Sequence, residues 1–102
     1  MLLCPVSPTA AFPHDQGEGT MFDKTIVVNG EDRPYVENVS WTGVIGNAGL
    51  PSAVPPLGRT ASGLPVGVQV VAPYLHDRTA VAVAGLLAEA VPDAGYRPPP
   101  GF

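Results

Sequence analysis

Residues 63–72 constrain the fold more than any other part of the chain, and they read Gly-Leu-Pro-Val-Gly-Val-Gln-Val-Val-Ala. Valine occupies four of the six positions at 66–71, which is typical of a strand covered on both faces. Gly63 and Pro65 precede this run as turn residues. The sequence therefore predicts an interior strand over residues 66–71.

Residues 77–91 have the spacing of an amphipathic helix. Asp77 is expected to cap its first turn, and Pro92 stands just past its end. The apolar stripe expected to face the strand consists of Ala80, Val83, Ala84, Leu87 and Val91. Strand and helix together make half of an α/β layer.

Residues 24–36 predict a β-hairpin, because Asn29-Gly30 tolerates positive φ at both centres of a type I′ turn. Lys24, at the start of the hairpin, is expected to be a solvated charge. Residues 37–48 follow with helical spacing. The apolar stripe of that helix is predicted to contain Trp41, Val44, Ile45 and Ala48.

A second Gly-Leu-Pro element lies upstream of the first, within residues 47–55, Asn-Ala-Gly-Leu-Pro-Ser-Ala-Val-Pro. Two such elements, the second ending in Val-Gly-Val-Gln-Val-Val, resemble the C-terminal part of the amidase signature family. Residues 2–9, Leu-Leu-Cys-Pro-Val-Ser-Pro-Thr, are similar to the family's apolar strand that runs into a Pro-Thr loop. The resemblance covers about residues 2–92.

The resemblance implies an α/β fold with a partial mixed β-sheet, covering helices and a β-hairpin. Residues 1–92 are then the C-terminal part of an amidase domain, and residues 93–102 are a Pro-rich tail. Enzymes of this family hydrolyse carboxylic amides with a serine nucleophile, a second serine that relays the proton and a lysine base. All three lie upstream of the part that this chain resembles.

No Gly-Ser-Ser-Gly-like segment occurs in the chain, and its isolated serines are Ser7, Ser40, Ser52 and Ser62. We therefore expect a C-terminal fragment that lacks the Ser/Ser/Lys set and is inactive alone, with no catalytic residue of its own. An amide substrate is expected only in the complete enzyme. A missing N-terminal half or another chain is the partner that this interpretation expects.

By the same resemblance, Pro8, Thr9 and Trp41 are expected to form part of a substrate-pocket wall. For Trp41 the alternative is a core aromatic residue packed beneath the hairpin. The loop at residues 7–23 is a candidate lid or pocket wall, because a structureless loop of this length in a compact domain is usually functional or mobile. The alternative is a surface excursion without a role in substrate binding.

Other chemistry has little support in the sequence. Cys4 and His14 are the one thiol–imidazole pair to consider, but Cys4 lies in an apolar run typical of a buried structural thiol. His14 and His76 each precede an aspartate directly, without the i, i+4 spacing that puts two metal ligands on one helix face. We expect neither a cofactor nor a metal.

Charged residues make up 14% of the chain and the net charge is −4, against roughly 25% charged residues in a typical soluble domain. The few cations form no basic patch, so neither nucleic acid nor a membrane is an expected partner. The start Met1-Leu-Leu-Cys4 lacks the basic and apolar regions of a secretory leader, which favours a cytoplasmic location. The low charge also permits a rival interpretation, a small non-catalytic interaction domain with an amidase-like scaffold.

Overall fold

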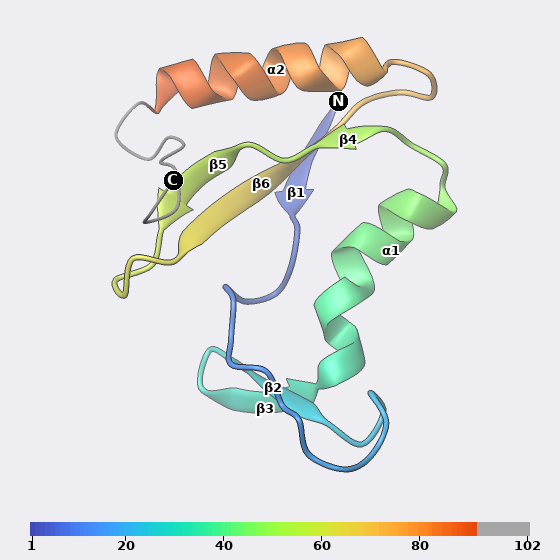
Figure 1. Cartoon of the computed structure of the whole chain (residues 1–102). Coiled ribbons are helices and arrows are strands. Elements are labelled where there is room, and N and C mark those ends of the chain that lie inside the picture. Colours follow the sequence, from blue (N-terminus) through green and yellow to red (C-terminus); the bar gives the residue numbers. More distant parts are fainter. Residues whose placement is uncertain (92–102) are drawn as a thin grey trace.

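The computed structural model describes residues 1–91 (Figure 1). Its elements, in chain order, are β1 (Leu2–Pro5), β2 (Thr25–Val28), β3 (Glu31–Pro34), the 3-10 helix η1 (Tyr35–Val39), α1 (Ser40–Asn47), β4 (Ser52–Ala53), β5 (Pro56–Arg59), β6 (Pro65–Val71) and α2 (Asp77–Ala90). The predicted tail at residues 93–102 lies outside the described residues. Within residues 1–91, no helix is both long and apolar enough to cross a membrane.

Strand β6 is the centre of the main sheet, as predicted. Strand β1 pairs with its second half along one edge, while β4 and β5 pair with it along the other. Every strand pair in the described part of the chain is antiparallel. The α/β class is confirmed, with a partial sheet, the covering helix α2, the second helix α1 and a hairpin.

Only the second half of β6 is covered on both faces. Val71 packs with Cys4 of β1 and Ile45 of α1 on one face. Side chains alternate along a strand, so Val70 points to the other face, where α2 lies above the sheet (Figure 1) and Val70 is fully buried. Val66, at the opposite end, remains 41% exposed. The prediction of burial along the whole strand was therefore wrong for its first half, which extends beyond the core.

Helix α2 forms where the spacing predicted it and ends one residue early, at Ala90. Ala80 is its buried residue, and the rest of the stripe is half-buried except for Val91, which is exposed and outside the helix. The predicted cap was wrong. His76 occupies the N-cap position without a side-chain hydrogen bond, and Asp77 lies in the first turn, where its charge favours the positive end of the helix dipole.

The hairpin β2–β3 is a separate two-stranded sheet. Asn29 and Gly30 have φ values of 53° and 84°, which confirms the turn that their dipeptide predicted. Ile26 is buried and Val27 is exposed, in the alternation of a strand with one covered face. Helix α1 and the loop after β1 connect this hairpin to the main sheet (Figure 1).

Helix α1 differs most from its prediction. Only Ile45 of the expected stripe is buried, whereas Trp41 is 44% and Val44 is 67% exposed. The helix meets the main sheet at one end only, through the Cys4 and Val71 cluster, so most of its apolar side has nothing to pack against. Trp41 is therefore not a core residue.

Two strands also depart from expectation. Strand β1 forms at the predicted place, but Leu2 and Leu3 are exposed and only Cys4 is buried. Strand β5 was not predicted, because its sequence Pro-Leu-Gly-Arg contains two residues that are depleted in strands. Pairing with β6 forms it, with an irregular register between Pro56 and Gly58.

Candidate functional site

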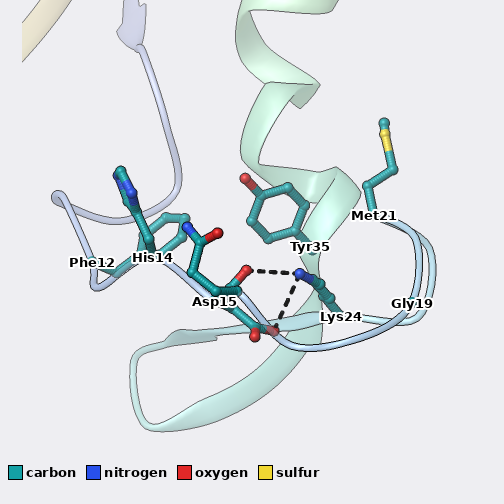
Figure 2. Close-up of a pocket in the computed structure, with 8 residues that line it drawn as sticks. Phe12, His14, Asp15, Gly19, Met21, Lys24 and Tyr35 are labelled. Carbon is teal, nitrogen blue, oxygen red and sulfur yellow. Dashed lines mark hydrogen bonds and ion pairs between the residues drawn. The ribbon is translucent and has the colours of Figure 1, made fainter.

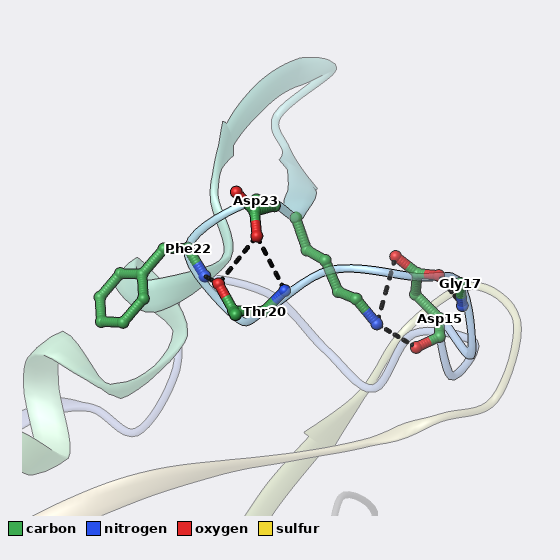
Figure 3. A network of polar contacts seen from close by, with 6 residues as sticks. Asp15, Gly17, Thr20, Phe22 and Asp23 are labelled. Atoms are coloured by element: carbon green, nitrogen blue, oxygen red, sulfur yellow. Dashed lines mark hydrogen bonds and ion pairs between the residues drawn. The ribbon is translucent and has the colours of Figure 1, made fainter.

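The loop between β1 and β2 is shaped by its own side chains (Figure 3). The Asp23 carboxylate accepts hydrogen bonds of 2.8 Å from both the backbone N–H and the hydroxyl of Thr20. These bonds stabilise the charged form, with the backbone bond contributing most, and hold the pKa of Asp23 below its ordinary value. The Gly17 N–H donates to Asp15 Oδ1 at 2.8 Å. Two local turns therefore order a segment that has no helix or strand.

Lys24, directly before β2 of the hairpin, binds the loop through its ammonium group. Its Nζ donates to the backbone oxygen of Asp15 at 2.7 Å and lies 3.8 Å from Asp15 Oδ2 (Figure 2). The Lys24 side chain is only 17% exposed. The prediction of a solvated charge was wrong, because the loop folds back over the ammonium group.

A hollow of about 380 Å³ lies between the loop and the start of η1. Its walls combine two aromatic rings and a thioether with charged and amide side chains. They consist of Phe12, His14, Asp15, Gln16, Gly19, Met21, Lys24 and Tyr35. Phe12 and Tyr35 meet edge to face, with their ring centroids 6.0 Å apart. A cavity of this size accommodates a small molecule.

The predicted pocket-wall residues, Pro8, Thr9 and Trp41, are near in sequence to residues that line the hollow. None of the three lines it. Pro8 and Thr9 are half-buried. The residue before them, Ser7, donates its hydroxyl hydrogen to Asn38 Oδ1 at 2.6 Å. That bond brings the start of the loop against η1, directly before the helix that carries Trp41.

The other residues considered from sequence are dispersed. Cys4 is buried and accepts a long hydrogen bond from Gln69 Nε2, at 3.6 Å, which fits a structural thiol. His14 lines the hollow. Within residues 1–91, no three histidine, cysteine or acidic side chains gather to hold a metal ion.

Sequence reasoning named the loop at residues 7–23 as a candidate pocket wall, but it did not predict this hollow or the aromatic residues that line it. Phe12 and Tyr35 are 23 positions apart in the chain, and neither belongs to a motif. A usable signal was the presence of aromatic and charged residues within a loop rich in proline and glycine, since loops carry binding residues more often than their composition suggests.

Comparison with known proteins identifies the family. The sequence model described as Amidase matches residues 1–81. This chain belongs to the amidase family. The match includes β1, the loop with its hollow, the hairpin, both Gly-Leu-Pro elements and the start of α2, and it confirms the resemblance carried by the two Gly-Leu-Pro elements.

Three relatives illustrate the range of similarity. The amidase-family chain is 47% identical over 62 residues to "Fatty-acid amide hydrolase 2-A" of Danio rerio, covering 61% of this chain and 11% of the relative. It is 47% identical over 55 residues to "Fatty-acid amide hydrolase 2" of Homo sapiens, covering 54% and 10%. It is 30% identical over 95 residues to a glutamyl-tRNA(Gln) amidotransferase subunit of Beijerinckia indica, covering 93% and 17%. The chain thus spans between 10% and 17% of the length of these relatives.

Proposed function

We propose that this chain is the C-terminal part of an enzyme that hydrolyses carboxylic amides in its full-length form. Membership of the amidase family supports the reaction class. The names of two relatives, both fatty-acid amide hydrolases, agree with it. In this proposal the 102 residues supply sheet, helices and pocket wall, while the nucleophile, the relay serine and the base belong to upstream residues.

We assign the catalytic residues to an upstream part of the enzyme because of the placement of Lys24, the one lysine in the sequence. Its ammonium group is held by Asp15. Within the described residues, Ser7 bonds to Asn38 and Ser62 to Thr60, and no hydrogen bond joins a serine to Lys24. Activation of a serine requires a base within hydrogen-bond reach, so this arrangement supports a non-catalytic role.

Pro8, Thr9 and Trp41 are our candidates for the wall that the chain adds to the substrate pocket. The bond between Ser7 and Asn38 supports this assignment, because it connects the Pro8-Thr9 segment to the approach of the helix bearing Trp41. The exposure of Trp41 leaves its indole free to contact other residues or a substrate.

The reaction assignment is tested by hydrolysis assays with simple aliphatic and aromatic amides. The purified chain should release product no faster than buffer, while a complete amidase in the same assay gives the reference rate. Extending the reading frame upstream of Met1 should reveal a Gly-Ser-Ser-Gly segment and restore hydrolysis. Turnover by the 102-residue chain that Lys24→Met abolishes would contradict the proposal, as would an extended protein without amidase activity.

A small non-catalytic interaction domain is the second candidate function. The observation that favours it is strand β1, an edge of the described sheet with the exposed apolar side chains Leu2 and Leu3. Unpaired edges of this kind recruit other chains. Sedimentation and chemical unfolding together separate the two candidates. A monodisperse species that unfolds cooperatively favours an independent domain. Aggregation that increases with concentration favours a fragment of a larger enzyme.

A further inference from the structure

Helix α2 packs on β4, β5 and β6 with one side and exposes the opposite side, its outer face (Figure 1). This face has an apolar centre, in which Val81 is 66% and Leu86 is 63% exposed, and charged residues at both ends. It consists of Asp77, Arg78, Val81, Ala82, Gly85, Leu86, Glu89 and Ala90. An exposed apolar patch with a polar rim is typical of a surface that binds another protein.

The outer face is symmetric about the middle of the helix. Each of its positions has an exposed counterpart at the same distance from the midpoint between residues 83 and 84. Two copies of a helix that pack antiparallel across a two-fold axis bring such counterparts together. The counterparts are Asp77 and Ala90, Arg78 and Glu89, Val81 and Leu86, and Ala82 and Gly85. A second copy would therefore place apolar residues against apolar residues, and no two like charges directly opposite each other.

The two charges of this face that become paired are unfavourably placed within a single chain. Arg78 lies in the first turn of α2 and Glu89 in the last, whereas the helix dipole favours the opposite signs at these ends. Within residues 1–91, neither side chain has an ion-pair partner. In an antiparallel pair of helices, each charge would lie beside the opposite charge and beside the favourable end of the other helix dipole. The placement therefore complements a second copy of α2.

Gly85 is the second residue that packing within the chain does not explain. A glycine inside a helix weakens it relative to alanine, yet a Cβ atom at Gly85 would meet nothing within 4 Å. Glycine on an outer face removes bulk between two helices, and Ala82 would lie opposite it. Because the distance between packed helices depends on the side chains at the contact, this small pair allows a close approach with Val81 and Leu86 packed on either side.

We propose that two copies of this chain associate through the outer face of α2, antiparallel and across a two-fold axis at the level of residues 83 and 84. Arg78 of each copy pairs with Glu89 of the other. The contact involves one helix of 14 residues from each copy, which is less than a standard interface of about 1,600 Å² requires, so the dimer is weak. The proposal goes beyond the proposed function, because association here uses neither a pocket nor an upstream residue.

Sedimentation equilibrium of the 102-residue chain, at concentrations from about 10 µM to 1 mM, should show a monomer–dimer equilibrium. Arg78→Glu and Glu89→Arg should each weaken dimerisation about tenfold or more, since the two-fold axis turns one substitution into two like-charge contacts. Both changes suit the dipole of α2 itself. Circular dichroism should therefore show undiminished helix content, which separates lost association from lost folding.

Mixing the two variants tests the register. The Arg78→Glu chain and the Glu89→Arg chain are complementary, so an equimolar mixture should dimerise although neither does so well alone. The double variant Arg78→Glu/Glu89→Arg should also regain dimerisation, because it exchanges the two charges without changing the net charge. The matched control is Glu18→Arg, an exposed change outside α2 that alters the net charge as Glu89→Arg does. It should leave dimerisation unchanged.

Gly85→Leu separates specific pairing from non-specific hydrophobic association. The substitution adds exposed apolar surface and favours the helix, so non-specific association would become stronger. Specific pairing should become weaker, because the added side chain forces the two helices apart.

Several results would overturn the proposal. A chain that remains monomeric at 1 mM, a concentration at which even weak dimers form, would leave this face to be covered by upstream residues of a complete enzyme. Association that responds to neither charge reversal would place the contact elsewhere, for example at the β1 edge. Failure of both the mixture and the double variant to regain dimerisation would refute the antiparallel register. None of these measurements depends on whether the full-length enzyme hydrolyses amides.

Discussion

Gly67 of β6 lies against the link between β4 and β5, and we predict that Gly67→Ala destabilises the chain. A Cβ atom at Gly67 would lie 2.7 Å from Val54 Cγ1 and 3.1 Å from the backbone oxygen of Pro55. Val54 is 49% exposed, so its side chain can rotate away. The Pro55 oxygen cannot rotate, because it belongs to the backbone and accepts a hydrogen bond from the Val68 N–H at 3.3 Å. Relief of the contact therefore requires the β4–β5 link to move away from β6.

The expected cost follows from two opposing terms. Forcing an extra methyl group into a packed site costs about 1–3 kcal/mol. Replacing glycine also reduces the entropy of the unfolded chain, which favours folding by about 0.4–1 kcal/mol. The difference ranges from about 0 to 2.6 kcal/mol and is centred on a net destabilisation of roughly 1.3 kcal/mol. Each kcal/mol lowers the melting temperature of a domain of this size by roughly 4–8 °C.

Thermal unfolding monitored by circular dichroism measures this loss, and amide hydrogen exchange at Val68 locates it. Exchange of the Val68 N–H should accelerate in Gly67→Ala, because its acceptor has moved. The matched control is Gly43→Ala in α1, where a Cβ atom meets nothing within 4 Å and helix propensity favours alanine by about 1 kcal/mol. A Gly67→Ala chain as stable as the unaltered one, with unchanged exchange at Val68, would refute the reasoning.

Three further perturbations have defined outcomes. Val70→Asp places an unpaired carboxylate at a fully buried position and should abolish soluble folded protein, whereas Val81→Asp on the exposed side of α2 should leave the soluble yield unchanged. Gly30→Ala places a side chain at φ 84° and should cost about 1 kcal/mol in chemical unfolding, a cost whose absence would contradict the turn geometry. The lowered pKa of Asp23 means that its hydrogen bonds favour folding above its unfolded value of 3.8, and that this contribution disappears as the pH falls through the lower folded value. Thr20→Val removes the hydroxyl donor and keeps the backbone N–H, so it should raise the pKa of Asp23 in part, which a carboxyl NMR titration measures. An unchanged titration would contradict the contribution of the hydroxyl.

The elements predicted correctly are those whose determinants are local. Asn29-Gly30 specifies its turn because few residues accept positive φ at two consecutive positions. Residues 77–91 specify a helix because their spacing repeats over several turns, and α2 ends within one residue of the prediction. Valine-rich β6 and the two Gly-Leu-Pro elements likewise identified the strand and the family from sequence alone.

The tertiary structure alone decided which surfaces are covered and which distant residues meet. Strand β5 exists because β6 pairs with a segment of poor strand propensity, and Trp41 is exposed because α1 reaches the sheet at one end only. Neither outcome is encoded in local spacing. The hollow depends on the loop that folds back until Asp15 meets Lys24 and Phe12 meets Tyr35. Sequence periodicity reports which side of an element is apolar, but burial and binding geometry require a second segment, and long-range packing determines where that segment lies.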